Sequence, residues 1–510
     1  MGLSCEWMDG YVFDVPYIAD FFFYQTPDFL NFCLLLNGFE HPPLKNFKFL
    51  ELGSGMGFNL NCMAALYPNG EFYGIDFNPE HICFSNKIKD DAGLKNVSFY
   101  ELSFEEFLKE RKDDFPKFDY IISHGVFSFV SDENKNFIVE IIKNKLKQGG
   151  VCYISYNDMC GCFFSVPIQR LLLDYSKLFP DLGSLAKINM GKNLIKKMKD
   201  AGCMYFNLPI MERLFKKFEI DRLNYLAHEY LNETWNPLFF TDVLSYMKGA
   251  KVKYVCQADP IWYFEDLFLT DKQLDFLKGR RSIVLKEIIK DYMVGMAFRK
   301  DLYIKGGQAL AKGELIEKIK NIKVVLRSPI RQEKFKVTPP YGNKNINIDS
   351  ELIKKLIEVL NDNSCTIGEM MALSGFQSME LSNILRVIAV LLHSRVIDVV
   401  LEAEGHNMES CVRLNKIVAK EARYKNLLQQ FCIPKSKSGI FVDIIKRLVY
   451  DALVNEGLKD LDSIISYVIK YTNEHEGVNF TKGEIEEEIS HCIEEDMVQW
   501  ERLGIIDIKL

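Results

Sequence analysis

Three glycines at alternate positions, Gly53, Gly55 and Gly57, are the residues whose spacing points most directly to chemistry. They follow an apolar run typical of a strand and precede Phe58, which opens an apolar helical pattern. A glycine turn between a strand and a helix lets a ligand approach backbone N–H groups closely. We therefore expect a ligand to lie against side-chain-free backbone at this turn.

Two acidic residues flank the turn. Glu51 lies just before the glycines, and Asp76 ends the next apolar run, 71–77. An acid at the end of a second strand can hydrogen-bond the hydroxyls of a ribose, which predicts a nucleoside ligand. The spacing GxGxG differs from the dinucleotide fingerprint GxGxxG, and a nicotinamide dinucleotide is kept as the competing ligand.

Apolar runs that alternate with helical patterns must position these residues. Strands alternating with helices form a parallel sheet with helices on both faces, and right-handed crossovers make it doubly wound. The sequence therefore predicts an α/β fold with a doubly wound, seven-stranded Rossmann-like core. The predicted strands are 47–52, 71–77, 96–102, 118–126, 151–156, 251–259 and 295–304, and the predicted helices are 58–67, 79–94, 104–114, 133–150 and 271–292.

Interruptions of this pattern divide the chain into predicted segments. The core occupies residues 1–164 and returns at 236–306, around a helical insertion at 165–235 in which we expect His228 and Glu229 to be structural. The remaining segments are a connector (307–347), a winged-helix-like domain (348–410) and a C-terminal helical domain (411–510), so this region is mostly α.

Composition narrows the classes of protein that this chain can be. With 510 residues, a net charge of −7 and a pI near 5.8, it gives no sign of a general nucleic-acid binder. Its 13 cysteines lack metal-binding spacing, so we expect reduced thiols and no metal site. We find neither a signal peptide nor a run of about 18 apolar residues. The sequence thus predicts a cytoplasmic protein with no membrane partner.

The pattern Glu51-x-Gly53-x-Gly55-x-Gly57, followed by Asp76, resembles the cofactor motif of class I S-adenosylmethionine-dependent methyltransferases. This resemblance implies S-adenosyl-L-methionine as cofactor and S-adenosyl-L-homocysteine as product, with the methionine portion lying across the glycines. Residues that follow the third and fourth strands would border the adenine and the cofactor. The predicted cofactor-binding residues are Glu51, Gly53, Ser54, Gly55, Gly57, Asp76, Phe77, Ser103, Phe104, His124 and Gly125.

Longer stretches resemble bacterial methyltransferases that carry a methyltransferase regulatory domain, a group that includes protein-lysine methyltransferases acting on bacterial surface proteins. These stretches are SHGVFSFV (123–130), GGVCYISYND (149–158), TPDFLNFCLLLNGFEHPP (26–43), LAHEYLNETWNPLFFTDVL (226–244) and AFRKDLYI (297–304). The resemblance implies a protein substrate and a homodimer formed through the helical insertion. Many relatives have Trp where Phe129 stands and Pro-Gly-Trp at 160–162, so the substrate does not transfer with the family.

A lysine acceptor would place demands on the site. Its amine has an unperturbed pKa of about 10.4 and must lose a proton before it attacks the methyl group. Burial among aromatic rings lowers that pKa and faces the cationic groups with π-systems. The predicted catalytic residues are Tyr17, Tyr156 and Asn157, and the predicted substrate-pocket residues are Tyr11, Phe127 and Phe129.

Two other functions remain open from the sequence. One is methylation of a small molecule in a biosynthetic pathway. The other is a DNA-binding regulator with a cofactor-sensing domain, suggested by the winged-helix-like segment. The helical pattern 379–394 in that segment carries one arginine, Arg386, and one histidine, whereas a recognition helix usually carries several cations. We therefore favour protein interaction over DNA binding for this segment.

Overall fold

The computed structural model describes residues 10–327, 336–337, 346–347, 350–362, 364–402, 408–475 and 480–507. The first nine residues, which bear on the expectation of no signal peptide, lie outside the described residues. Within the described parts of the chain, the helices lack the combination of length and apolar composition that crossing a lipid bilayer requires.

Seven strands form one sheet in the order β3-β2-β1-β4-β5-β7-β6, which confirms the predicted doubly wound α/β core. The strands β1 to β5 run parallel, whereas β7 pairs antiparallel with both β5 and β6. The order reverses between β1 and β4, and ligands of such sheets bind at the carboxyl ends of the strands there. The bounds are β1 (Lys48–Leu52), β2 (Glu71–Asp76), β3 (Val97–Glu101), β4 (Phe118–Ser123), β5 (Leu146–Asn157), β6 (Lys253–Gln257) and β7 (Phe298–Ile304).

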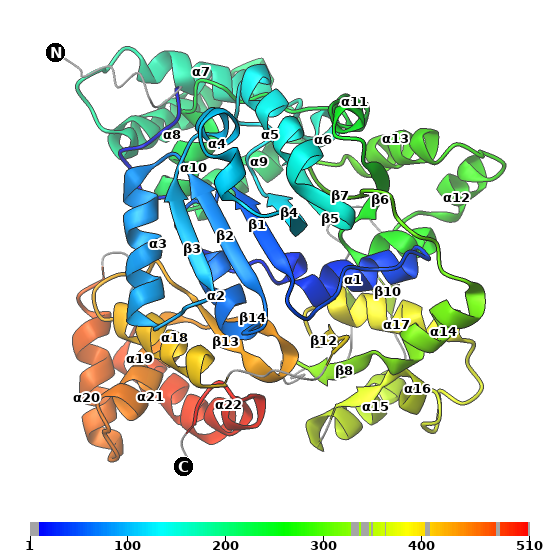
Figure 1. Ribbon diagram of the computed structural model, residues 1–510. Coiled ribbons are helices and arrows are strands. Elements are labelled where there is room, and N and C mark those ends of the chain that lie inside the picture. The colour runs from blue at the N-terminus through cyan, green and yellow to red at the C-terminus, as the bar shows by residue number, and fades with distance from the viewer. Residues whose placement is uncertain are drawn as a thin grey trace.

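Helices cover both faces of the sheet (Figure 1). On one face α2 and α3 pack on Phe49 and Phe72, and on the other α4, α5 and α11 pack on Leu50 and Ile121. Helix α1 lies at the β6 end of the first face. The bounds are α1 (Pro27–Leu36), α2 (Phe58–Leu66), α3 (Pro79–Asp91), α4 (Phe104–Lys109), α5 (Asp132–Lys145) and α11 (Phe240–Gly249).

The structure differs from the sequence prediction in two of the longer helices. One ends earlier than predicted, and the other is divided into two helices. The helix predicted over 133–150 ends at Lys145, because Leu146 is extended and pairs with Phe118 of β4 as the first residue of β5. Gly149, which was expected to stop the helix, lies inside this strand with left-handed backbone (φ 75°). The helix predicted over 271–292 is divided into α12 (Asp271–Leu277) and α13 (Ile283–Val294). Gly279 is left-handed (φ 79°), and the Ser282 hydroxyl accepts a hydrogen bond from Leu285 N to start α13.

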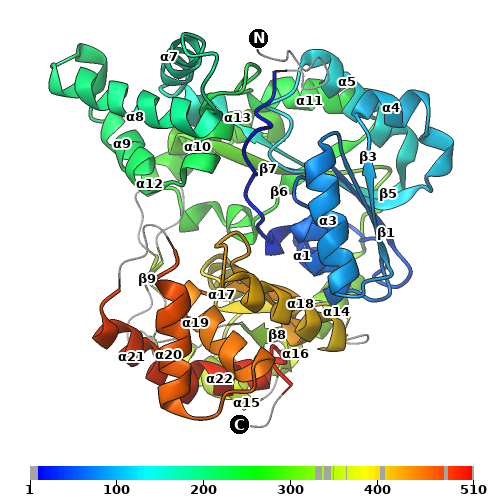
Figure 2. The same ribbon diagram turned by 90° about the vertical axis from the view of Figure 1, so that its left-hand side faces the viewer.

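Residues 158–235 form a helical layer with its own apolar core, to which Val12 and Val15 of the N-terminal segment contribute. Figures 1 and 2 place this layer at the opposite end of the molecule from the C-terminal helices. The elements are α6 (Met159–Cys162), α7 (Val166–Ser176), α8 (Ser184–Asp200), η4 (Met204–Asn207), α9 (Met211–Ile220) and α10 (Leu223–Tyr230).

The range expected to be a connector, 307–347, contains regular structure. Strand β8 (Lys323–Leu326) is the centre of a three-stranded sheet with β11 (Cys365–Thr366) and β12 (Ile397–Val400). The expected connector loop at 338–345 lies outside the described residues. The neighbouring elements are α14 (Lys312–Asn321), β9 (Lys336–Val337), β10 (Ile346–Asn347), α15 (Ser350–Asp362), α16 (Ile367–Met370) and α17 (Leu381–His393). A winged-helix identity for this region stays a prediction.

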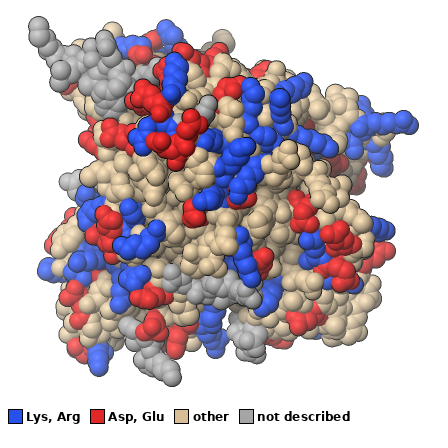
Figure 3. Space-filling model, in the orientation of Figure 1, with Lys and Arg blue, Asp and Glu red and all other residues tan. Residues whose placement is uncertain are grey.

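The C-terminal helices share one apolar core with the sheet. Leu414 and Val418 of α18 lie in the same cluster as Leu60 and Met63 of α2. Figure 3 shows basic and acidic side chains interspersed over most of one face of the molecule. The elements of the region are α18 (Met408–Glu421), β13 (Gln430–Ile433), β14 (Ser438–Phe441), α19 (Ile444–Tyr450), α20 (Leu461–Thr472), α21 (Lys482–His491) and α22 (Met497–Leu503).

Candidate active site

The glycine turn lies between β1 and α2, and all three glycines have left-handed backbone: φ is 72° at Gly53, 52° at Gly55 and 64° at Gly57. Their surroundings differ. A Cβ on Gly53 would lie 2.6 Å from Cγ2 of Val126, and one on Gly57 would collide with Ser85, whereas one on Gly55 would meet no heavy atom within 4 Å. Backbone and packing therefore require glycine at the two outer positions, and Gly55 faces open space.

Asp76, at the end of β2, is held against this turn. Its Oδ2 accepts a hydrogen bond from Gly55 N (2.8 Å), and its Oδ1 accepts one from Asn78 N (3.0 Å). His81 Nδ1 lies 3.2 Å from the same Oδ1. The carboxylate is therefore fixed at the carboxyl edge of the sheet, at the position where an acid can hold a ribose.

Glu51 is a buried acid with an unused oxygen. Its Oε1 accepts a hydrogen bond from Asn59 Nδ2 (3.1 Å), but among the described residues its Oε2 has no hydrogen-bond partner. Burial raises the pKa of Glu51 to about 8, with Asp76 adding to the rise and Asn59 opposing it. A buried polar atom without a partner is costly, so this oxygen suits a ligand that brings a donor.

His124 follows β4 and is held from both ring nitrogens. Nδ1 lies 2.8 Å from Ser155 Oγ and 3.0 Å from the Tyr153 hydroxyl, and Nε2 lies 3.3 Å from the Tyr24 hydroxyl. Burial, reinforced by Lys300, lowers the pKa of His124 to about 3, so the ring is neutral. The next residue, Gly125, is left-handed (φ 66°) and, like Gly55, faces open space.

Two adjoining cavities meet at these residues. We name cavity A the one of about 240 Å³ between the glycine turn, the N-terminal segment 17–22 and α10, and cavity B the one of about 160 Å³ that extends toward the ends of β2 and β3. Every predicted cofactor residue lines one or both. Cavity A includes Glu51, Ser54 and Gly57; cavity B includes Asp76, Phe77, Ser103 and Phe104; both include Gly53, Gly55, His124 and Gly125.

Four of the six predicted catalytic and pocket residues also reach the cavities. Tyr17 and Phe129 line both, Asn157 lines cavity A, and Tyr11 lines cavity B. The Asn157 Oδ1 accepts a hydrogen bond from Trp235 Nε1 (3.2 Å), which orients its amide.

Tyr156 and Phe127 do not reach either cavity, so the roles predicted for them are corrected. Side chains alternate across a strand, and Tyr156 therefore points away from the face that Ser155 and Asn157 share. Its hydroxyl donates to Asp301 Oδ2 (2.7 Å) in a buried cluster around Arg299. Phe127 is fully buried and packs edge-on against Tyr246, with ring centroids 5.5 Å apart.

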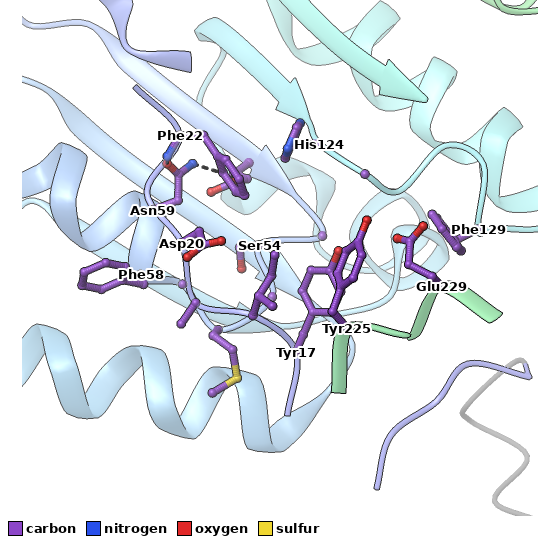
Figure 4. Close-up of a pocket in the computed structure, with 18 of the residues that line it drawn as sticks. Tyr17, Asp20, Phe22, Ser54, Phe58, Asn59, His124, Phe129, Tyr225 and Glu229 are labelled. Atoms are coloured by element: carbon purple, nitrogen blue, oxygen red, sulfur yellow. Dashed lines mark hydrogen bonds between the residues drawn. The ribbon is translucent and has the colours of Figure 1, made fainter. Parts of the chain in front are cut away.

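Residues of cavity A that were not predicted as site residues from the sequence include Asp20, Phe22, Tyr225, Glu229 and Phe298. Figure 4 shows Tyr17, Tyr225 and Glu229 on one side of the cavity and Asn59, Phe22 and His124 on the other. Burial raises the pKa of Asp20, against the lowering effect of Arg222 and Arg395. Glu229, which was expected to be structural, also lines this cavity. An acid inside the aromatic run YIADFFFYQ (17–25) was the available signal for Asp20.

His228, by contrast, has a structural environment. Its ring packs between those of Tyr11 and Tyr17, with centroids 5.4 and 4.9 Å away, and its Nε2 lies 2.9 Å from the Val15 carbonyl oxygen. Burial lowers its pKa to about 4, which keeps the ring neutral. His228 therefore attaches the N-terminal segment to α10.

Two protein families and several bacterial proteins are similar in sequence to this chain. A methyltransferase-domain family matches residues 43–223, and a family described as a predicted methyltransferase regulatory domain matches residues 222–305. An uncharacterized protein of Synechocystis sp. is 29% identical over 450 residues, which is 87% of either chain. An uncharacterized protein of Rickettsia prowazekii is 32% identical over 231 residues, covering 44% of this chain and 89% of its own length.

The fold has a solved counterpart in PKMT2 from Rickettsia typhi, whose structure was determined in complex with AdoHcy. The TM-score is 0.68 at 20% identity, and the match covers 95% of this chain and 99% of the other. The similarity thus includes the C-terminal helices as well as the sheet. Both family matches name methyltransferases and none names a nicotinamide enzyme: the chain carries a methyltransferase domain and a methyltransferase regulatory domain on a class I S-adenosylmethionine-dependent methyltransferase fold.

Proposed function

We propose that this enzyme methylates the side-chain amines of lysines in a protein substrate. The observation that carries the proposal is the lining of cavity A, where the carboxylates of Asp20 and Glu229 stand among the rings of Tyr17, Tyr225 and Phe298. Acids and aromatic faces both attract a cationic amine. The same lining disfavours a phosphate-bearing acceptor, whose charge the two carboxylates would repel.

The cofactor-binding residues fit S-adenosylmethionine. The unpartnered Glu51 Oε2 would accept a hydrogen bond from the amino group of the methionine portion, which would lie over the open side of Gly55 and Gly125. Asp76 would hold the ribose, and cavity B would hold the base beside Phe77 and Phe104. The Ser103 hydroxyl oxygen accepts from Glu106 N (3.1 Å) as the cap of α4, so Ser103 would contribute mainly through its backbone. When bound, the cofactor supplies a methyl group on an electrophilic sulfonium.

The side chains of cavity A then orient and desolvate the acceptor. Methyl transfer is an in-line displacement, so positioning of the attacking nitrogen contributes much of the rate. Asp20 and Glu229 would draw the ammonium in, and the aromatic rings would exclude water around it, which favours the neutral amine. Asn157, with its amide fixed by Trp235, would accept a hydrogen bond from that amine.

Transfer of an isotopically labelled methyl group from the cofactor to a cell lysate tests the proposal. We expect the label in the protein fraction, released on hydrolysis as N-methylated lysine. Gly55→Val is the control, since a side chain there fills the open space of the turn. Label in nucleic acid, or only in small molecules, would contradict the proposal; the second outcome would favour a biosynthetic small-molecule methyltransferase.

We further propose that the enzyme forms a homodimer through the helical insertion and resides in the cytoplasm. Support for a dimer comes from large apolar side chains exposed on the insertion, among them Leu178, Met204 and Ile220, which are 71%, 85% and 80% exposed. Support for the location comes from the twelve cysteines in the described part of the chain, all free thiols. Light scattering of wild type and Ile220→Glu would test the dimer.

A further inference from the structure

A third cavity, cavity C, lies beside cavity A and is not used by the proposed mechanism. Its volume is about 310 Å³. It lies where η2 (Phe23–Gln25), η5 (Pro260–Tyr263) and β7 meet the end of α17, so the sheet domain and the C-terminal region both contribute to it. The lining residues used below are Phe23, Tyr24, Trp262, Phe298, Lys300 and Arg395.

Cavity C is next to the methyl-transfer site. Phe298 lines both cavity A and cavity C, and its ring meets that of His124 edge-on, with centroids 5.6 Å apart. The Tyr24 hydroxyl, from the cavity C side, lies 3.3 Å from His124 Nε2. Phe298, Tyr24 and His124 thus lie between the two cavities, which share Phe298 in their linings.

Two cations face cavity C. The Lys300 ammonium lies 4.3 Å from the centre of the Tyr24 ring, and the Arg395 guanidinium lies 5.4 Å from that of Phe23. Among the described residues neither cation has a carboxylate oxygen within 4.0 Å. The carboxylate of the cavity, Asp259, is engaged by His393 Nδ1 (2.9 Å) and by Ile261 N (3.2 Å).

The charge balance favours an anionic occupant. Burial lowers the pKa of Lys300; Asp259 opposes this effect, and repulsion from Arg395 adds to it. An apolar occupant would exclude water from the two cations without supplying a partner, which is costly. A carboxylate would supply charge-assisted hydrogen bonds, and its methylene stem could pack on Trp262 and Phe23.

We propose that cavity C binds the carboxylate of an aspartate or glutamate close in sequence to the acceptor lysine, so that the enzyme selects lysines with an acidic neighbour. The inference rests on the proposed function, since it takes a peptide segment as the occupant. Lys300 and Arg395 are then specificity residues, and cavity A keeps the reacting groups.

A binding measurement tests cavity C without methyl transfer. Trp262 lines the cavity, so N-acetylglutamate amide should change the tryptophan fluorescence of the full-length protein, and Trp262→Phe should remove that change. We expect Lys300→Gln and Arg395→Gln to weaken this binding about tenfold or more each, as loss of a charge-assisted hydrogen bond predicts. Lys312→Gln, an exposed lysine of α14, should not. Equal binding of N-acetylglutamine amide, or no effect of Lys300→Gln, would overturn the inference.

Methylation of matched peptides links the cavity to the substrate. Peptides with one lysine carry glutamate or glutamine at each neighbouring position in turn. Wild type should methylate the glutamate member of at least one pair about tenfold faster, and Lys300→Gln should bring that ratio near one without slowing the glutamine peptide. Methylation with no such preference would overturn this inference alone. Failure to methylate any lysine peptide, while the amide still binds, would instead overturn the proposed function and the assignment of the carboxylate to a protein substrate.

Discussion

At the scale of one residue, the carboxyl group of Glu51 makes the stability of the ligand-free protein depend on pH. Burial raises its pKa from 4.5 to about 8, so the folded protein holds this proton more tightly than the unfolded chain. The resulting stability is fully present below pH 4.5 and is lost as pH rises toward 8. With about 1.4 kcal/mol per pKa unit, the loss in the ligand-free protein amounts to a few kcal/mol.

Glu51→Gln should therefore flatten the fall of the unfolding free energy across this pH range, as denaturant titrations at several pH values would measure. The same variant should bind S-adenosylhomocysteine about tenfold or more weakly, because the ligand's ammonium loses a charged partner. An unchanged pH dependence, or unchanged affinity, would contradict the role given to Glu51.

Tyr156 should contribute to the stability of the fold and not to methyl transfer. Its hydroxyl donates to Asp301, which also pairs with Arg299 (3.0 Å), and all three side chains are fully buried. Tyr156→Phe should lower the unfolding free energy by about 1.5–3 kcal/mol, the range for hydrogen bonds to charged groups. At a temperature where the variant is folded, its methyl-transfer rate should stay within about twofold of wild type. A large loss of rate without loss of stability would restore Tyr156 to the catalytic residues.

The residues predicted for the cofactor all line the two cavities, because a local turn and the ends of consecutive strands carry them. Of the six residues predicted for catalysis and the substrate pocket, Tyr156 and Phe127 do not line either cavity. Whether Tyr156 or Asn157 faces the cavity depends on strand facing, which the apolar run of β5 does not reveal, since both faces of the strand are buried. Asp20 and Glu229 come from segments that meet only in the folded chain, and no local pattern connects them.

At the scale of elements, the N-terminal segment that lines cavity A is held by the C-terminal hairpin. Ala19 forms a parallel bridge with Leu428, the Phe21 N–H donates to Gln430 Oε1, and Arg222 donates to Gln429 Oε1. Asp20 and Phe22, on either side of Phe21, line the cavity. The hairpin of β13 and β14, with the residues just before it, thus positions the segment that lines cavity A.

Gly439→Ala tests this arrangement from outside the cavity. A Cβ on Gly439 would lie 2.5 Å from Cδ1 of Phe21, so it should displace the N-terminal segment. The overpacking should lower the free energy of unfolding by about 1–3 kcal/mol. We expect kcat/KM for a lysine peptide to fall about tenfold while the dissociation constant of S-adenosylhomocysteine stays within about twofold. Gly483→Ala, where a Cβ meets no atom within 4 Å, is the control. Equal kinetics for the two variants would refute the positioning role.

At the scale of the whole molecule, the C-terminal helices complete the sheet domain. Side chains of α18 and α19 lie in one apolar cluster with α2 and the first face of the sheet, and Figure 1 shows these helices below the sheet. Alternation of strands and helices predicted the sheet, but it could not show which distant helices cover it, because that contact joins segments hundreds of residues apart.

A chain that ends at residue 306 should therefore not fold as a minimal methyltransferase. It would expose the apolar face of α2, so we expect the fragment to aggregate or to bind a hydrophobic dye. In the full chain, the sheet domain and the C-terminal helices should unfold in one transition, because they share one apolar core. Co-expression of residues 307–510 should restore soluble protein. A soluble, cooperatively folded 1–306 fragment would show that the shared core is dispensable.

The most direct test of the account is the rate of methyl transfer to a lysine peptide by Asp20→Asn and Glu229→Gln, measured beside the affinity of each variant for S-adenosylhomocysteine. If the two carboxylates receive the acceptor ammonium in cavity A, kcat/KM should fall about tenfold or more in each variant while cofactor affinity stays within about twofold. Unchanged kcat/KM in both variants would contradict the assignment of cavity A to a lysine amine.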